Sequence, residues 1–315
     1  MIFYEQLGKL HNIGGIMKDL TPRQADLMLF FVAFFWGTGF SVTKIALEIF
    51  TATQLLFLRF AIASAASLIL FGKKLKKTTK SDVKAGFIMG VFLAAGYVFQ
   101  TIGLKGTTTG NSAFLTGTNV VMVPFFYWLI TKIKPGKNNL VAAGLMFVGI
   151  ILLTVDFKNF GNFNLWDFLT FLCAICFAWQ LIATGIFASD KDPVLISTLQ
   201  LLTCTVIFFF MMLVENQHFN VNAKGAASML YLGLITTMLC FIMQTMGQKY
   251  TSTTHAAIIL SLESVIGSLF GVLFLNEKYS VITIIGFAVI FLAVLVAETG
   301  YDWIFKKVNF LKNKI

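Results

Sequence analysis

The sequence has little charge and no long polar segment. Only 12% of its 315 residues are Asp, Glu, Lys or Arg, whereas 57% are hydrophobic and the mean hydropathy is +0.83. Soluble domains carry about 25% charged residues, so this composition excludes a soluble enzyme, a nucleic-acid-binding protein and a disordered chain. It predicts instead helices that cross a lipid bilayer, each with roughly 20 apolar residues.

The sequence also lacks the patterns that carry enzymatic chemistry. It has no His-Glu-x-x-His motif, no Gly-x-x-x-x-Gly-Lys-Ser/Thr loop and no pair of aspartates within an apolar run. All four cysteines lie in apolar runs, at Cys173, Cys176, Cys204 and Cys240. Apolar surroundings keep a thiol protonated and unreactive, so we expect packing rather than the redox pair that the Cys173-x-x-Cys176 spacing would allow. We therefore expect no catalytic residue, no metal site and no cofactor.

Ten apolar runs, separated by charged residues or by Gly, Pro and Asn, are long enough to cross a bilayer. They lie near residues 26–48, 52–71, 83–104, 110–131, 138–156, 165–187, 194–214, 226–249, 254–275 and 281–298. These runs predict an all-α integral membrane protein with ten transmembrane helices. Tails at residues 1–25 and 299–315 flank the runs, and the second tail is basic.

Lys and Arg residues are unevenly divided between the two sides of the predicted bundle. If the N-terminus is cytoplasmic, seventeen lie on the cytoplasmic side and four on the other. The positive-inside rule then predicts that both termini are cytoplasmic. Five of the seventeen lie at residues 73–80, and an alternative role for this cluster is to bind lipid head groups.

The sequence repeats itself at a distance of 144 residues. Without a gap, Gln100-Thr101-x-Gly103-x-Lys105-x-Thr107-x-Thr109 aligns with Gln244-Thr245-x-Gly247-x-Lys249-x-Thr251-x-Thr253. Residues 26–156 and 165–298 are therefore predicted to be two repeats of five spans. Because five is odd, the second repeat enters the bilayer from the opposite face, which is the architecture of many transporters.

The repeat also pairs single polar and aromatic residues. The same offset pairs Asn119 with Glu263, and shifts of one to three residues pair Trp36 with Trp179 and Arg59 with Gln200. No counterpart exists for residues 1–16, which match nothing in either repeat. Met17-Lys18-Asp19 stands just before the first span, so we expect Met17 to be the true start of the protein. We expect no cleavable signal peptide before that span.

Several short motifs lie in or next to the predicted spans. They are Trp36-Gly37-x-x-Phe40-x-x-x-Lys44, Arg59, Ser112-Ala113-Phe114-Leu115-Thr116-Gly117 with Val123-Pro124, Ala178-Trp179, and Ser261-Leu262-Glu263 with Gly271 and Glu277. In these motifs the chain resembles the EamA-type members of the drug/metabolite transporter superfamily, over residues 22–298. The resemblance implies an exporter of a small metabolite in a bacterial cytoplasmic membrane. In one respect the chain departs from the family, because Ser264 stands where a helix-breaking proline often follows the glutamate.

Aromatic residues lie near the predicted middle of the membrane. At about 1.5 Å of rise per helical residue, Trp36 and Trp179 come near the centre of a hydrocarbon layer about 30 Å thick. Tryptophan is normally enriched at the membrane surface, so we interpret these two as walls of a central cavity. The alternative is that they only fill gaps between helices. Tyr97, Gln100 and Gln244 add polar groups to the same region.

Asn119 and Glu263 lie at a depth of about 13 Å in spans that run in opposite directions. An ionisable group in the bilayer core is costly and usually faces a bundle interior or a wet cavity. We therefore expect both residues in the substrate site, with Glu263 exchanging protons or contacting a substrate amine. The alternative for Glu263 is a neutral, hydrogen-bonded acid that holds helices together.

Three further charges are interpreted as gating or structural. Lys44 and Glu48 have i, i+4 spacing near the outer surface, so we expect an interfacial ion pair between them. Arg59 lies roughly 10 Å below that surface. We expect it to donate to helix-end carbonyl groups or to a carboxylate such as Glu48, as a gate contact rather than a substrate contact.

Together these features predict a secondary transporter that alternates access to a midplane cavity. Two tryptophans, Tyr97 and one acid favour a small, partly apolar metabolite with an amine, such as an amino acid or a related compound. Its surroundings would be membrane lipid, protons are a candidate coupling ion, and no nucleic acid is expected as a partner. The alternatives are an integral-membrane enzyme and a channel or facilitator without ion coupling. The sequence leaves open whether the protein is a monomer or a dimer.

Overall fold

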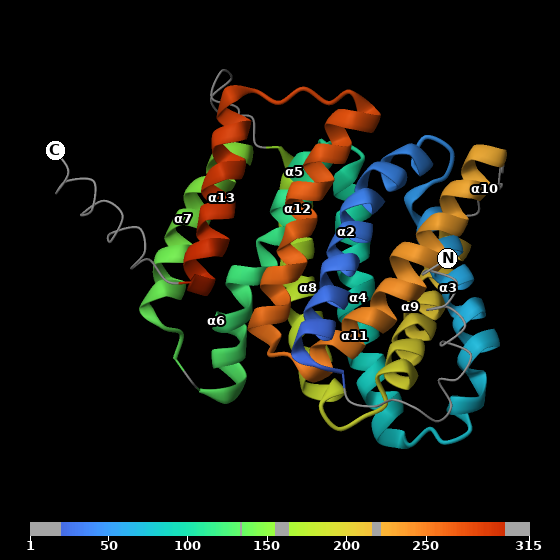
Figure 1. Ribbon diagram of the computed structural model, residues 1–315. Coiled ribbons are helices and arrows are strands. Elements are labelled where there is room, and N and C mark those ends of the chain that lie inside the picture. Colours follow the sequence, from blue (N-terminus) through green and yellow to red (C-terminus); the bar gives the residue numbers. More distant parts are fainter. Residues whose placement is uncertain (1–19, 133, 155–163, 216–221, 300–315) are drawn as a thin grey trace, which may run out of the picture.

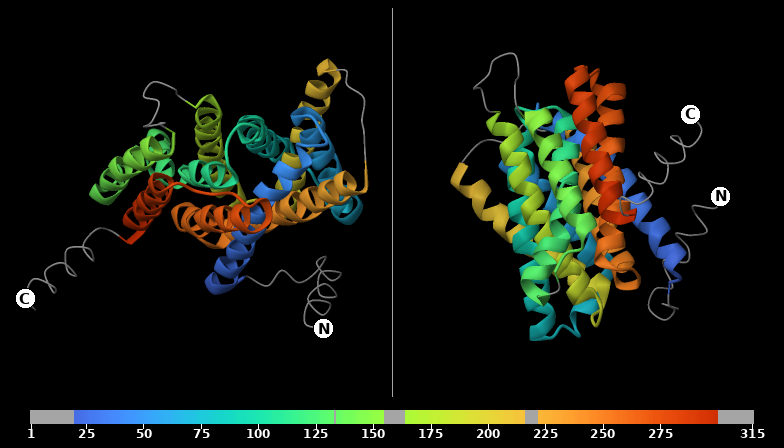
Figure 2. Two further views of the ribbon diagram at one scale, coloured as in Figure 1. Left: turned by 90° about the horizontal axis from the view of Figure 1, so that it is seen from above. Right: turned by 90° about the vertical axis from the view of Figure 1, so that its left-hand side faces the viewer.

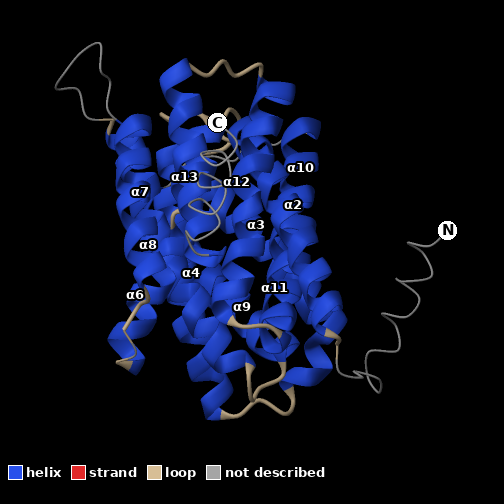
Figure 3. Cartoon of the chain, turned by 60° about the vertical axis from the view of Figure 1, so that its left-hand side comes forward, coloured by secondary structure: helices blue, strands red, loops and turns tan. Residues whose placement is uncertain are grey.

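The computed structural model describes residues 20–132, 134–154, 164–215 and 222–299, and every regular element in these ranges is a helix (Figures 1 and 3). In chain order the elements are α2 (Pro22–Ala46), α3 (Ala52–Leu75), α4 (Lys80–Leu104), α5 (Thr109–Gly117), α6 (Asn119–Thr131), α7 (Lys137–Thr154), α8 (Leu165–Ala188), α9 (Pro193–Glu215), α10 (Ala223–Leu230), η1 (Tyr231–Leu239), α11 (Cys240–Tyr250), α12 (Thr253–Leu275) and α13 (Val281–Thr299). Met17 and most of both predicted tails lie outside the described residues.

The thirteen helical elements of the described residues make up ten spans. Helices α5 and α6 together form one span, and α10, η1 and α11 together form another. Eight spans are long and apolar enough to cross a membrane, and two apolar helices, Lys137–Leu152 and Val281–Val296, are shorter. The prediction of an all-α membrane protein with ten transmembrane helices is confirmed. Figure 1 shows the spans running side by side along one direction, as helices in a bilayer must.

Threonine caps fix where several spans begin. The Thr21 hydroxyl accepts the N–H of Gln24 at 3.3 Å, and the Gln24 side chain accepts the N–H of Thr21 at 2.9 Å. The same reciprocal cap occurs at Thr51 and at Thr79. Such caps satisfy backbone N–H groups that have no partner within the helix. They place the ends of α2, α3 and α4 at the boundary between polar loops and apolar spans.

The two halves pack on each other as an inverted repeat. Helix α4 of the first half packs against α8 and α9, and the corresponding segment of the second half, η1 with α11, packs against α2 and α3. Likewise α12 packs against α2, and α6 packs against α8. Helices α7 and α13 pack on each other at one edge of the bundle (Figure 2). The predicted arrangement of two inverted five-helix repeats is therefore present.

Glycines allow the halves to approach closely, as their spacing predicts. A Cβ atom at Gly90 of α4 would lie 2.5 Å from Cβ of Thr203 in α9, and one at Gly86 would collide with Leu199. In α12, a Cβ at Gly267 would lie 2.7 Å from Cβ of Ala113 in α5. These contacts are intramolecular, so close helix packing within the chain explains the glycine pairs.

The fourth span is broken beside Asn119. The Thr118 hydroxyl donates to the Leu115 carbonyl oxygen at 2.6 Å, and the Thr118 N–H donates to the same oxygen at 3.2 Å. In a regular α-helix this oxygen accepts the N–H of Asn119, so Thr118 competes with the regular bond. Helix α5 therefore ends at Gly117 and α6 begins at Asn119.

The ninth span, α12, is unbroken through Glu263. Ser264 keeps the backbone N–H that a proline would lack. Its hydroxyl donates to the Ala113 carbonyl oxygen of α5 at 2.9 Å. The departure from the family pattern at this position therefore coincides with a continuous helix.

The eighth span contains a π-helical segment, η1. At its end the Cys240 N–H donates to the Ile235 carbonyl oxygen five residues back, as a π-helix requires. The Thr236 carbonyl oxygen, which would accept this N–H in an α-helix, accepts the indole N–H of Trp36 at 2.9 Å. This carbonyl group is part of the site described next.

Candidate functional site

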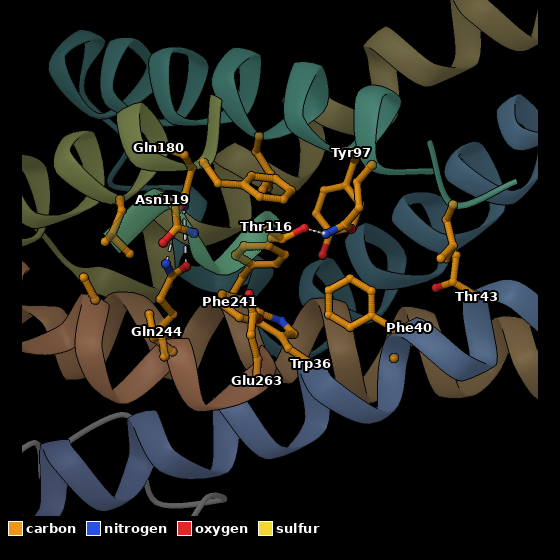
Figure 4. A pocket seen from close by; sticks show the side chains of 18 of the residues that line it. Trp36, Phe40, Thr43, Tyr97, Thr116, Asn119, Gln180, Phe241, Gln244 and Glu263 are labelled. Carbon is orange, nitrogen blue, oxygen red and sulfur yellow. Dashed lines mark hydrogen bonds between the residues drawn. The ribbon is translucent and has the colours of Figure 1, made fainter. Parts of the chain in front are cut away.

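A cavity lies between the two halves near the middle of the bundle. It comprises about 710 Å³ of empty space, including the part that is open to the outside. Its lining residues are Trp36, Gly39, Phe40, Thr43, Arg59, Leu93, Tyr97, Gln100, Leu104, Thr116, Asn119, Phe177, Gln180, Leu181, Phe241, Gln244, Ala257, Leu260 and Glu263. Figure 4 shows Thr43 and Tyr97 toward one end of this space, Gln180 and Gln244 toward the other, and Glu263 and Trp36 between them.

The structure brings six of the seven predicted substrate-site residues together in this cavity. They are Trp36, Tyr97, Gln100, Asn119, Gln244 and Glu263. The seventh, Trp179, does not line it. Its ring stacks instead on Phe126, with centroids 4.9 Å apart, and on Phe92, with centroids 5.9 Å apart. Whether the six residues bind substrate stays a prediction.

Gln180 lines the cavity in the place expected for Trp179. One residue along an α-helix turns the side chain by about 100°, so neighbours on α8 point in different directions. The gapless offset of 144 residues pairs Trp36 with Gln180, whereas pairing the two tryptophans needed a shift of one. The gapless alignment of the two repeats therefore predicts that Gln180, rather than Trp179, corresponds to Trp36. The same offset pairs Tyr97 with Phe241, another lining residue that sequence reasoning missed.

Trp36 is held by a carbonyl group of the π-helix. Its indole Nε1 donates to the Thr236 carbonyl oxygen at 2.9 Å. Its ring packs against Phe241, with centroids 5.2 Å apart. A partly buried indole needs such a partner for its N–H, and Thr236 of the π-helix supplies it here. The π-helix thus fixes one aromatic wall of the cavity.

Arg59 is buried on α3, with 4% of its surface exposed. Its Nε donates to the Thr237 hydroxyl at 2.5 Å, and its Nη2 donates to the Tyr97 hydroxyl at 3.0 Å and the Thr236 hydroxyl at 2.9 Å. The guanidinium carbon lies 4.5 Å from the centre of the Tyr97 ring, which adds a cation–π contact. The expected contacts with helix-end carbonyl groups or Glu48 are wrong, because hydroxyl groups of η1 and α4 hold the guanidinium.

Glu263 is 7% exposed and projects into the cavity beside Trp36 (Figure 4). Its carboxyl group forms no hydrogen bond or ion pair with another described residue. A helix-pinning acid would have such partners. Asn119, at the break of the fourth span, lines the same cavity and is half-buried.

Two buried glutamines, Gln180 and Gln244, line the end of the cavity away from Thr43 (Figure 4). Gln180 Nε2 donates to Gln200 Oε1 at 3.1 Å and to Gln244 Oε1 at 3.4 Å. Gln244 Nε2 returns a hydrogen bond to Gln180 Oε1 at 3.4 Å. Gln200 Nε2 is buried and finds no acceptor among the described residues. This end is therefore polar but uncharged.

Contacts close the bundle at the end where the α4–α5 and α12–α13 loops lie. Lys44 Nζ donates to the Thr107 carbonyl oxygen of the α4–α5 loop. Glu277 accepts the N–H of Thr109 at 2.7 Å, the Thr109 hydroxyl at 2.6 Å and the Tyr279 hydroxyl at 2.6 Å. Burial raises the pKa of Tyr279 above its usual range, so this hydroxyl stays protonated and donates to Glu277.

The predicted ion pair between Lys44 and Glu48 does not form. Helix α2 ends at Ala46, before Glu48, so the two residues are not one turn apart on a helix. Glu48 pairs instead with Lys224, at 3.1 Å, on an exposed surface. Within the described ranges, no three His, Cys, Asp or Glu side chains gather to hold a metal ion.

Comparison with known proteins decides the family. A model of the EamA-like transporter family matches residues 23–155 and, a second time, residues 164–299. The chain belongs to the EamA-like transporter family. An uncharacterized transporter of Archaeoglobus fulgidus is 32% identical over 284 residues, which cover 90% of this chain and 89% of that protein. The resemblance to EamA-type transporters drawn from the sequence is confirmed.

Other relatives of this EamA-like transporter are more distant. The uncharacterized transporters YwfM and YyaM of Bacillus subtilis are 24% and 21% identical, and the matches cover 94% and 92% of their lengths. One solved crystal structure superposes with a TM-score of 0.64 over 87% of this chain and 96% of that chain, at 17% identity. This likeness extends to the fold. The protein is thus a multi-pass membrane transporter whose cavity is bounded by both repeats.

Proposed function

We propose that the protein is a secondary transporter that exports a small organic metabolite, such as an amino acid or a related compound, across a bacterial cytoplasmic membrane. The observation that carries this proposal is Glu263, a buried carboxyl group that has no hydrogen bond or ion pair with the described residues, in a cavity shared by the two inverted repeats. An ionisable group at this depth is costly unless it serves a substrate or an ion. The sequence has no nucleotide-binding loop, so an ion or substrate gradient would supply the energy.

Different contacts close the two ends of the bundle, as alternating access requires. At one end Lys44 binds the α4–α5 loop. At the other end, Gln248 Nε2 donates to the Leu181 carbonyl oxygen at 3.0 Å. In addition, His255 Nε2 lies 3.2 Å from Asp26 Oδ1. Opening one set of contacts while the other stays closed would expose the cavity to one side at a time.

In this mechanism Glu263 exchanges protons between the two open states or binds a substrate amine. Removal from water disfavours a charged carboxylate, so the group would take up a proton when the cavity is dry and release it when the cavity is wet. Glu263→Gln keeps the shape and hydrogen-bonding capacity of the side chain but removes its titration. We expect this variant to fold normally and to lose gradient-driven transport, while exchange of substrate for substrate survives.

The test uses proteoliposomes containing the full chain. Vesicles are loaded with unlabelled amino acids and diluted into each labelled amino acid in turn, with and without an imposed pH gradient. Glu215→Gln is the matched control, since this exposed carboxylate lies outside the cavity and accepts hydrogen bonds from Thr51 and Thr53. Transport by Glu263→Gln equal to that of wild type, with the same pH dependence, would overturn the role of Glu263.

The same vesicles separate a carrier from its alternatives. A carrier gives saturable counterflow, whereas a channel gives flux that rises linearly with concentration and shows no counterflow. A chemically altered product would indicate an enzyme. Orientation is tested by reporter fusions after residues 78, 160 and 315, which should report cytoplasmic, external and cytoplasmic positions. An external signal after residue 78 contradicts the proposed topology.

A further inference from the structure

Arg59 is a buried cation without a counterion in the part of the chain that the structure describes. It is 4% exposed, and none of the ion pairs among the described residues includes it. All of its hydrogen-bond partners are neutral hydroxyl groups, on Tyr97, Thr236 and Thr237. A buried charge of this kind is strongly unfavourable unless something balances it. The guanidinium group is therefore held in place by the protein but left electrically uncompensated.

Counting donors shows which part of the guanidinium is unused. The group has five N–H donors, one on Nε and two on each terminal nitrogen. The Thr237 hydroxyl takes the donor of Nε, and Tyr97 and Thr236 take the two donors of Nη2. Nη1 donates to no described residue, although Arg59 lines the cavity. Its two N–H groups are the unused ones.

No described acidic group pairs with Arg59. Glu48 pairs with Lys224 at the surface, and Glu215 accepts hydrogen bonds from Thr51 and Thr53. Glu263 lines the same cavity but lies beyond 4 Å of the guanidinium nitrogens, since it forms no ion pair. No described carboxylate thus occupies the position that would neutralise Arg59.

We propose that the Arg59 guanidinium binds a carboxylate of the transported metabolite through Nη1, so that the substrate is a monocarboxylate or a zwitterion. This inference rests on the proposed transport function and replaces the expectation that Arg59 is only a gate contact. The single positive charge of Arg59 and its unused Nη1 match a carboxylate with one negative charge. Hydrogen bonds between two charged groups are stronger than those between neutral groups. Tyr97, Trp36 and Phe241 offer an apolar wall for the rest of the molecule (Figure 4). The amine of a zwitterion would find its partner in Glu263.

The first test measures binding rather than transport. Thermal unfolding of the purified full chain in detergent is followed with matched pairs of probes: L-leucine and L-leucinamide, L-phenylalanine and L-phenylalaninamide, and 3-phenylpropanoate and 3-phenylpropanamide. At least one acid should raise Tm in a saturable way, and its amide should not. Arg59→Gln should weaken binding of that acid about tenfold or more, and Arg59→Lys should recover part of it.

Arg23→Gln is the matched control, since it removes the other arginine of the chain at an exposed position. It should bind the acid as wild type does. The proposal is overturned if no acid raises Tm, if an amide binds as well as its acid, or if Arg59→Gln keeps wild-type affinity. Stabilisation by inorganic phosphate and by none of the carboxylates would also overturn it, in favour of a phosphorylated substrate.

A second measurement covers the case in which Arg59→Gln fails to fold. Arg23 and Arg59 are the only arginines in the sequence, so Arg59 is the single target of p-hydroxyphenylglyoxal in an Arg23→Lys variant. Intact mass should show one modification, which an acid probe blocks and its amide does not. Absence of modification, or modification that no acid slows, contradicts the proposal. Carboxylate binding without any counterflow would overturn the transport function but leave the binding of a carboxylate by Arg59 standing.

Discussion

The two halves of the chain share one backbone plan but carry different chemistry at corresponding positions. The second span of the first half places Arg59 in the cavity, while its counterpart in the second half is the neutral Gln200. The fourth span places Asn119 at a break, while the ninth carries Glu263 on an unbroken helix. Inverted symmetry therefore supplies a scaffold with two related arrangements, and the side chains make the cavity itself asymmetric. An asymmetric cavity can distinguish the two ends of a small molecule.

The two halves also differ in where their helices depart from regular α-helical geometry. The first half breaks its fourth span because Thr118 bonds to the Leu115 carbonyl oxygen. The second half instead widens its eighth span into a π-helix, and the Thr236 carbonyl oxygen accepts the indole N–H of Trp36. Among the described spans, the two halves thus depart from the regular α-helix at different places. Exchanging these features between the halves tests how much each one matters.

The largest effect is expected from a proline placed in the unbroken helix α12. Ser264→Pro removes the N–H of residue 264 and places a ring against the preceding turn of α12, which costs about 3 kcal/mol or more. We expect a large drop in the midpoint of thermal unfolding in detergent. Ser264→Ala, which loses only the hydrogen bond to Ala113, should cost about 1 kcal/mol. Equal stability of the two variants would show that α12 tolerates the break.

The second test concerns the contact between the broken and unbroken spans. A Cβ at Gly117 would collide with the Ser264 hydroxyl, and the next nearest atom is Cβ of Ser264 at 3.5 Å. Gly117→Ala should therefore cost about 2 kcal/mol through overpacking. Gly117→Ala combined with Ser264→Ala should be more stable than Gly117→Ala alone, because the colliding oxygen is gone. Additive losses in thermal unfolding would refute this contact.

The third test compares the two tryptophans that the repeat relates. Trp36→Phe leaves the Thr236 carbonyl without its donor and should cost about 1–2 kcal/mol. Trp179→Phe keeps an aromatic ring to stack on Phe126 and should cost less. Thermal unfolding of both variants provides the comparison. A larger loss for Trp179→Phe would mean that the π-helix carbonyl contributes little.

The smallest effect is expected at the exposed ion pair that links the halves. Lys224 and Glu48 keep 58% and 63% of their side-chain surface exposed. Such pairs contribute about 0.2–1 kcal/mol and are screened by salt. Lys224→Ala should shift the unfolding midpoint little, and raising the salt concentration should remove any difference from wild type. A marked, salt-independent loss would indicate a role for Lys224 beyond this pair.

Composition and hydropathy predicted most of the fold because the bilayer restricts the possible structures. A span must be apolar and helical, so ten apolar runs define ten helices. The gapless repeat around Gln100 and Gln244 then predicts the inverted packing. Depth along a helix also follows from residue number, which is why six residues predicted near the midplane line the cavity.

Direction around a helix axis was harder to predict. An error of one residue in the repeat register selected Trp179 instead of Gln180, which points elsewhere on α8. The partners of Arg59 were missed because Thr236 and Thr237 belong to a π-helix, and hydropathy does not distinguish a π-helix from an α-helix. Glu48 was assigned to Lys44 because the end of α2 at Ala46 was not foreseen.

The edge formed by α7 and α13 lies away from the cavity. The two helices pack on each other along this edge (Figure 2). Many of their exposed side chains are apolar, among them Leu140, Phe147, Ile282 and Ile285. Acyl chains can pack against such a surface without leaving a polar group unpaired. Neither helix lines the cavity, so lipid contacts the protein here through a part that never touches the substrate.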